Sequence, residues 1–189
     1  SWDAETGAFT NQMYVTDNDL VDMMPTVAMD GENISVSWVR NDANNLVGTD
    51  GNYQIYQTAI PADGYQPEKL LYSTEDYVVE IASGMDDEGV HLIFASMNES
   101  GTVDLYGFSG NETNKLVSSG NPAGLSYADG MFLWQEDGSI YSYVPGAAKV
   151  NVLIGSETAA VSSSYEYVTN GTEAAVVWTD MNENGYQVN

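Results

Sequence analysis

The sequence contains no cysteine among its 189 residues. Disulfide bonds, thiolate metal sites and cysteine nucleophiles are therefore excluded. Secreted eukaryotic domains often carry disulfides. A cysteine-free, acidic chain rich in Asn, Ser, Thr, Gly and Tyr fits a bacterial protein better, and we expect an extracellular or cell-surface location. The chain starts with Ser1-Trp2 and shows no signal peptide, so we expect a mature or excised piece of a longer protein.

Positive charge is almost absent. Four Lys and Arg residues face 28 Asp and Glu residues, which gives a formal net charge of −24. Such a surface repels phosphate backbones and anionic lipids, which excludes nucleic-acid binding. It suits divalent cations, basic partners or solubility at high concentration. No run of about 18 apolar residues occurs, so no membrane insertion is expected.

Arginine and histidine occur once each, as Arg40 and His91. A sialidase-type clamp on a carboxylate needs several arginines, so that activity is excluded, and we expect Arg40 to pair with nearby acids. A Ser-His-Asp triad would have to use His91, but no Gly-x-Ser-x-Gly turn is present. Because His91 lies inside the apolar stretch Val90–Phe94, we expect a structural role. A zinc site lacks the necessary nitrogen and sulfur ligands.

What the chain does contain is a recurring pattern. A turn with glycine leads into an apolar strand that ends in an aromatic residue, and this happens four times. The aromatic anchors are 56, 40 and 44 residues apart, namely Trp38, Phe94, Trp134 and Trp178. A period of about 40 to 50 residues with several short strands per copy is typical of a β-propeller blade. We therefore assign the anchors to packing between blades.

Each copy reads as four strands. The expected strands are Thr26–Ala28, Ile34–Trp38, Asn52–Tyr56 and Leu70-Leu71 in the first copy; Val79–Ala82, Val90–Phe94, Val103–Tyr106 and Leu116-Val117 in the second; Leu125–Tyr127, the strand ending at Trp134, Ser139–Tyr141 and Val152-Leu153 in the third; and Tyr165–Val168, Ala174–Trp178 and Asn184–Val188 in the fourth. The one helical candidate lies around Leu20–Met24 and is stopped by Pro25.

The predicted fold is all-β, a β-propeller of about four four-stranded blades, possibly a fragment of a larger propeller. We expect one domain over residues 1–189, with blade units at roughly 25–78, 79–124, 125–164 and 165–189. Thr10 to Thr16 reads as an outermost strand, so residues 1–24 could complete the last blade. Paired half-rings and a β-sandwich are the alternatives, and an incomplete ring should self-associate.

Two motifs carry a family resemblance. Pro25-Thr-Val-Ala-Met-Asp-Gly31 followed by Ile34–Trp38, together with the Gly-x-Ile/Leu-Tyr strand, resembles the blades of bacterial secreted β-propellers. The resemblance implies a module of a large cell-surface protein, often from Gram-positive anaerobes. The sequence departs from WD repeats, since no Trp-Asp pair ends the third strand. It also lacks the Ser-x-Asp-x-Gly-x-x-Trp box of sialidase-like propellers. The resemblance carries no catalytic residues.

Calcium is the best metal hypothesis. Asp180-x-Asn182-x-Asn184-Gly185 has the alternating oxygen ligands and the turn glycine of a calcium loop, and Asn41–Asn45 is a looser parallel. The same residues also form ordinary β-turns. Three aromatic residues outside the repeat, Trp2, Tyr65 and Tyr77, are candidates for an exposed binding surface.

We expect a non-catalytic binding or spacer module whose ligand is a protein or a glycan. The alternative is a carboxylate-dependent glycoside hydrolase, which needs two or three converging acids. The acid groups Asp86-Asp87-Glu88 and Asp17, Asp19 and Asp22 are the candidates, although both also read as solvated turns.

Overall fold

The computed structural model describes residues 2–9, 13–46, 50–60, 66–155, 161–169, 172–182 and 185–188. Within this part of the chain the secondary structure is all strand. No helix in it is long and apolar enough to cross a membrane. The architecture is therefore all-β, as the alternating apolar pattern predicts.

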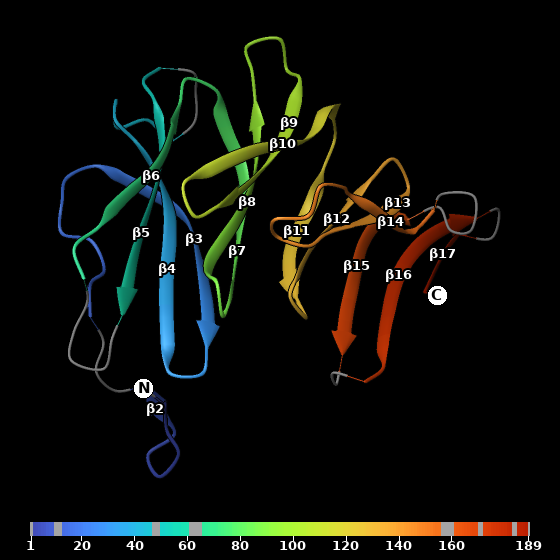
Figure 1. The fold of residues 1–189 in the computed structure, drawn as a ribbon, viewed down its shortest axis with the longest axis horizontal. Helices are drawn as coiled ribbons and strands as arrows, with labels where there is room; N and C mark the ends of the chain where they lie inside the picture. Colours follow the sequence, from blue (N-terminus) through green and yellow to red (C-terminus); the bar gives the residue numbers. More distant parts are fainter. Residues whose placement is uncertain are drawn as a thin grey trace.

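Four sheets follow one another along the chain, and in each of them consecutive strands pair antiparallel (Figure 1). The first sheet consists of β3 (Val21–Asp30), β4 (Asn33–Asn41), β5 (Tyr53–Ile60) and β6 (Lys69–Thr74). The second consists of β7 (Tyr77–Asp86), β8 (Gly89–Met97), β9 (Val103–Ser109) and β10 (Glu112–Gly120). The third consists of β11 (Ala123–Ala128), β12 (Met131–Glu136), β13 (Ser139–Tyr143) and β14 (Asn151–Ile154). The fourth consists of β15 (Val161–Thr169), β16 (Ala174–Asn182) and β17 (Gly185–Val188).

The repeat pattern located the strands of the four sheets. Each apolar segment expected from the sequence falls on one of β3 to β17, because turn residues set the strand ends. Asp129-Gly130 and Asp137-Gly138, for example, both have positive φ and form two-residue hairpin loops on either side of β12.

The helical candidate around Leu20–Met24 is not a helix, because these residues lead into and form part of the strand β3. Pro25 sits where the pairing of β3 with β4 shifts register between Met23 and Thr26, next to Met24 with φ of 51°. A proline at a bulge removes no ladder hydrogen bond, so the strand continues through it.

The four sheets form an open fan. Their first strands β3, β7, β11 and β15 contact one another in this order. In Figure 1 the sheets follow from left to right, with the N-terminus below the first sheet and the C-terminus beside the fourth. Over the residues that the structure describes, the sheets do not close into a ring. β1 (Trp2–Asp3) pairs only with β2 (Ala8–Phe9) as a separate two-stranded hairpin.

The outermost strand expected at Thr10–Thr16 is not formed in its described part, since Met13 to Thr16 have no strand conformation. Residues 10–12 lie outside the described residues. Completion of the last blade by residues 1–24 stays a prediction.

Two buried clusters join the first three sheets. The cluster between the first and second sheets contains Val39 and Ile55 on one side and Leu92 and Phe94 on the other. The cluster between the second and third sheets contains, among others, Ile93, Ala95, Leu105, Phe132 and Trp134. Side chains alternate along a strand, so β8 sends even-numbered residues toward the first sheet and odd-numbered ones toward the third. We call the side facing the preceding sheet the front face and the other side the back face.

One cross-strand aromatic pair recurs on the front face of three sheets. Each anchor lies directly opposite a tyrosine on the next strand, and the rings are stacked. The pairs are Trp38–Tyr56 (centroids 5.9 Å apart), Phe94–Tyr106 (5.2 Å) and Trp134–Tyr141 (5.7 Å). Phe94 and Trp134 belong to the clusters between sheets, which confirms the packing role expected for these two anchors.

Candidate functional site

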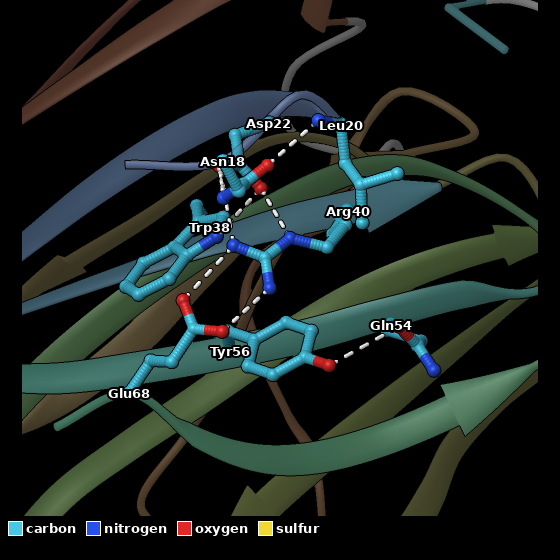
Figure 2. Close-up of polar contacts among 8 residues, drawn as sticks. All are labelled: Asn18, Leu20, Asp22, Trp38, Arg40, Gln54, Tyr56 and Glu68. Carbon is cyan, nitrogen blue, oxygen red and sulfur yellow. Dashed lines mark hydrogen bonds and ion pairs between the residues drawn. The ribbon is translucent and has the colours of Figure 1, made fainter. Parts of the chain in front are cut away.

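The single arginine lies in a cluster of polar contacts on the first sheet (Figure 2). Arg40 is on β4, and Asp22 on β3 is its direct cross-strand neighbour. The guanidinium Nε donates to Asp22 Oδ1 at 2.7 Å and Nη1 to Glu68 Oε1 at 2.7 Å. Nη2 donates to both carboxylates, at 3.2 Å to Asp22 Oδ2 and 2.9 Å to Glu68 Oε2. Arg40 therefore pairs with acids, as expected from the sequence.

Aromatic rings enclose this guanidinium. Its central carbon lies 4.3 Å from the ring centroid of Tyr56, a cation–π contact. Trp38 stacks on Tyr56 and donates its Nε1–H to Asp22 Oδ1 at 3.0 Å. Asn18 donates to Asp22 Oδ2 at 3.1 Å and accepts from the backbone of Leu20 at 2.7 Å. The cluster thus ties the segment before β3 to the front face of the first sheet.

The charges of the cluster reinforce one another. Hydrogen bonds from the guanidinium to Glu68 raise the pKa of Arg40, against the opposing effect of burial. Burial by itself would raise the pKa of Asp22, but the hydrogen bonds from Arg40 and Asn18 outweigh it and lower that pKa below its usual value. Both groups stay charged at neutral pH. Four of the five guanidinium N–H donors are taken by these bonds, so a ligand carboxylate could bind the guanidinium through two bonds only by displacing Asp22 or Glu68.

The single histidine forms a hydrogen-bonded chain with a serine and an aspartate. His91 Nδ1 lies 3.0 Å from Ser109 Oγ, and Nε2 lies 2.8 Å from Asp86 Oδ1. Burial would raise the pKa of Asp86, but the bonds from His91 and from the Glu88 backbone outweigh it and lower that pKa.

Ser109, His91 and Asp86 are the residue types of a catalytic triad, but the backbone around Ser109 does not have the conformation of a nucleophilic serine. Ser109 is the cross-strand neighbour of His91 in a regular ladder, whereas a nucleophilic serine stands on a sharp turn beside oxyanion donors. His91 is buried and holds the β7–β8 turn to β9. The structure thus supports the structural role expected for His91.

Acidic turns from three successive sheets meet around one open hollow. Its lining includes Asp30 from the β3–β4 turn, Asp86, Asp87 and Glu88 from the β7–β8 turn, and Asp129 from the β11–β12 turn. Tyr127 also lines it and donates to the backbone oxygen of Met85 at 3.3 Å. The Asp86-Asp87-Glu88 group therefore has acidic neighbours that its sequence context could not reveal. The second acid group divides, because Asp22 turns toward Arg40 while Asp17 and Asp19 are exposed.

A second hollow lies between the first strands of the third and fourth sheets. Three tyrosines line it together with hydroxyl and amide groups, namely Tyr127, Tyr165, Tyr167, Ser126, Ser164 and Gln135. Tyr165 donates to the backbone oxygen of Gly124 at 2.7 Å and lies 3.0 Å from Ser126 Oγ. Burial raises the pKa of Tyr165 to about 12, so it stays a neutral donor. This hollow combines rigid aromatic surface with polar groups.

The calcium hypothesis at Asp180, Asn182 and Asn184 falls outside the described residues, since Asn184 and the side chains of the other two are not described. The looser parallel forms an ordinary turn. Asn41 Oδ1 accepts from the backbone of Ala43 and Asn45, and Asp42 accepts from both nitrogens of Asn52. Elsewhere in the described part, no group of three His, Asp or Glu side chains is placed to hold a metal ion.

The three aromatic candidates for an exposed surface also separate. Tyr77 is half-buried and packs edge-on against Tyr53 at 5.1 Å, in the cluster between the first two sheets. The interpretation of Tyr77 as an exposed platform is therefore wrong. Tyr65 and the side chain of Trp2 lie outside the described residues.

Sequence reasoning missed Glu68, Tyr165 and Glu80. Glu80 accepts from the backbone of Gly124 and Leu125 at 3.1 and 2.9 Å and so links the second and third sheets. Tyr165 lies in β15, a strand that the sequence predicts, but its contact with β11 depends on how the third and fourth sheets pack. No local signal marks any of these three residues.

No family model and no curated protein matches the chain. Solved structures do. Trypanosoma rangeli sialidase in complex with sialic acid matches with a TM-score of 0.50 at 12% identity, over 97% of this chain and 38% of the sialidase chain. A mutant of that sialidase displaying trans-sialidase activity matches with a TM-score of 0.49 at 14% identity, over the same 97% and 38%. The chain thus spans well under half of the sialidases it is similar to, and the likeness concerns the fold: the chain has a β-propeller-like all-β architecture.

Proposed function

We propose that the chain is a non-catalytic binding or spacer module on the β-propeller plan, with about four blades and part of a bacterial secreted or surface protein. Its sheets supply a rigid frame, since the first three pack on one another through two buried clusters that include the Phe94–Tyr106 and Trp134–Tyr141 pairs. The strongly acidic composition without cysteine fits a bacterial secreted protein better than a eukaryotic one, in which disulfides are frequent.

One observation supports the non-catalytic assignment over a sialidase-type activity. The guanidinium of the only arginine makes four hydrogen bonds to two carboxylates of this chain, Asp22 on β3 and Glu68 just before β6. Capture of an acidic sugar would need that group free, because a planar guanidinium binds a carboxylate with the same N–H donors. The single histidine is likewise engaged, by Asp86 and Ser109.

The hollow between β11 and β15 is the proposed binding surface, and a glycan is the ligand class that its lining favours. Tyrosine rings offer flat faces to sugar rings, and the serine and glutamine groups can exchange hydrogen bonds with sugar hydroxyls. A protein loop is the other ligand class considered.

An immobilised array of bacterial and host glycans tests this surface. Replacement of Tyr167, which lines the hollow, by alanine should abolish binding of any glycan that the unmodified chain retains. Tyr14→Ala is the matched control, because Tyr14 is an exposed tyrosine that does not line this hollow. Equal loss in both variants, or retention on proteins rather than glycans, would contradict the proposal.

Calcium at Asp180, Asn182 and Asn184 belongs to the same proposal. Melting with excess calcium and with a chelator measures it directly, since a ligand that binds the folded state raises the midpoint. Asp180→Asn should remove the shift, and an identical midpoint in calcium and chelator would contradict the site.

A carboxylate-dependent glycoside hydrolase is the second candidate, because acids from three sheets line one hollow beside Tyr127. Hydrolysis of aryl glycosides, sialosides included, is the assay. Turnover that disappears in Asp129→Asn would favour the hydrolase over the binding module, and no turnover is expected.

A further inference from the structure

The two ends of the fan leave apolar side chains uncovered. On the front face of the first sheet, Val27 and Met29 are 61% and 66% exposed. On the back face of the fourth sheet, Val168 and Val188 are 64% and 74% exposed. Cross-strand partners share a face of their sheet. Val27 pairs with Val36, which is on the front face of the first sheet, and Val188 pairs with Thr179, which is on the back face of the fourth sheet. Exposed apolar faces at both ends of a repeat array call for partners.

The internal repeat shows that the same back-face positions are buried wherever another sheet follows. The residue just before each aromatic anchor is Ser37, Ile93 and Leu133 in the first three sheets, and all three are fully buried. The corresponding residue of the fourth sheet is Val177, which is 42% exposed. The fourth sheet thus presents a blade face with nothing packed on it among the described residues.

The front-face positions behave in the same way. By register, Val27 corresponds to Ser83 in the second sheet and Tyr127 in the third. Ser83 is buried against the first sheet, and Tyr127 packs in the cluster with the second. Val27 therefore stands where a front-face residue meets a preceding sheet.

The sizes of the facing residues point to the partner. At the back-face position of Val168, the earlier sheets have Ala28, Gly84 and Ala128. The smallest of them, Gly84, faces the Tyr127 ring so closely that an added Cβ would lie 2.2 Å from it. The side chain of Val168 fills the space that Gly84 leaves to the Tyr127 ring. A partner face that has a valine where the third sheet has Tyr127 would therefore fit against Val168 better than an aromatic residue. The first sheet offers that valine, Val27.

We propose that a second copy of this chain covers these faces, so that the front face of the first sheet in each copy packs on the back face of the fourth sheet in the other. The contact continues the order of the existing interfaces, back face to front face, and a two-fold axis closes it into a two-copy ring. The proposal rests on the propeller plan of the proposed function but not on its ligand.

Charge sets the conditions for this assembly. Each copy carries a net charge of −24, so two copies repel one another at low ionic strength. The exposed residues proposed to meet, Val27 and Met29 on one side and Val168, Val177 and Val188 on the other, are apolar. Added salt screens the repulsion and leaves the apolar contact in place, so dimerisation should strengthen as sodium chloride is raised.

Sedimentation equilibrium of the chain in low and high sodium chloride tests the proposal. We expect a dimer that tightens with salt. Val27→Asp and Val177→Asp should each weaken association at least about tenfold, because an unpaired charge enters the contact. Val152→Asp is the matched control, an exposed valine on β14 away from both end faces. Melting curves verify that all three variants fold.

A mixture of the two end-face variants separates this geometry from others. Val27→Asp keeps an intact fourth sheet and Val177→Asp an intact first sheet, so mixing them should restore one contact and part of the dimer. A chain that stays monomeric at high salt, an open polymer, or normal dimers of Val27→Asp would each overturn the proposal. Glycan binding is measured separately and does not depend on this result.

Discussion

The first and second sheets both place a cation over the recurring aromatic pair, but the two clusters differ in depth. Arg40 lies over Tyr56 and is held by two carboxylates, with its side chain 5% exposed. Lys115 lies 5.3 Å from the Tyr106 ring centroid and pairs only with Asp104, at 2.6 Å, with its side chain 44% exposed. One arrangement therefore occurs once inside the protein and once at its surface.

The difference follows from where each cation stands in its sheet. Arg40 is on the second strand, beneath Glu68 and next to Asp22, whereas Lys115 is on the outermost strand β10. Water screens the exposed Lys115 ammonium and competes for it, so its pair with Asp104, which is 15% exposed, contributes little. The Arg40 cluster is different, because the Arg40 and Asp22 side chains are only 5% and 18% exposed, so removal of Arg40 leaves the Asp22 charge uncompensated with little water around it. Similar contacts in the two sheets should therefore have very different effects on stability.

The largest effect is expected at Arg40. Arg40→Met leaves Asp22 without its cation and should lower the free energy of unfolding by about 3 kcal/mol, the lower end of the range for a buried pair because Glu68 is 40% exposed, measured by urea denaturation. Adding Asp22→Asn and Glu68→Gln to that variant should recover part of the loss, since the unpaired charges then disappear. A change below about 1 kcal/mol for Arg40→Met would show that the cluster behaves like a surface pair.

Trp38→Phe gives the first sheet the phenylalanine that the second sheet has at Phe94. The variant loses the hydrogen bond from Trp38 to Asp22, a charged acceptor, which is worth about 1.5–3 kcal/mol in addition to packing. Trp134→Phe is the control, because the Trp134 Nε1 is buried with no hydrogen-bond partner among the described residues. Equal destabilisation of the two variants would contradict a role for the Asp22 bond.

A smaller effect is expected in the pH dependence. The folded pKa of Asp22 is lowered, so its contribution is fully present above the unfolded pKa of about 3.9 and is lost as the pH falls through the folded value. The difference in unfolding free energy between the natural chain and Asp22→Asn should therefore be larger at neutral pH and shrink in acid. A difference that stays constant across this range would mean that Asp22 titrates normally.

The smallest effect is expected at Lys115. Lys115→Met should leave the urea midpoint unchanged within error, since the ammonium is exposed and a methionine can still cover the Tyr106 ring. The comparison with Arg40→Met is made in the same buffer. A loss comparable to that of Arg40→Met would show that depth does not separate the two clusters.

Much of the fold could be predicted from the sequence because its signals are local. Period-two alternation around Ile34–Trp38 and the Asp-Gly turn at Asp129 fix strands and hairpins within a few residues. The helix at Leu20–Met24 failed because Pro25 was interpreted as a stop, although the bulge in β3 accommodates it. For the Arg40 cluster, the sequence indicated an acidic partner. It could not indicate Glu68, which is 28 residues away, just before β6, and reaches Arg40 because β6 pairs alongside β5.

The sequence by itself determined the strands, their order within each sheet, the recurring aromatic anchors and the scarcity of cations, because backbone geometry and composition act over short stretches of chain. The tertiary structure alone decided which carboxylates enclose Arg40, which turns share a hollow, and that the fan of sheets stays open. These features depend on how sheets pack face to face, and that packing is set by side chains far apart in the sequence.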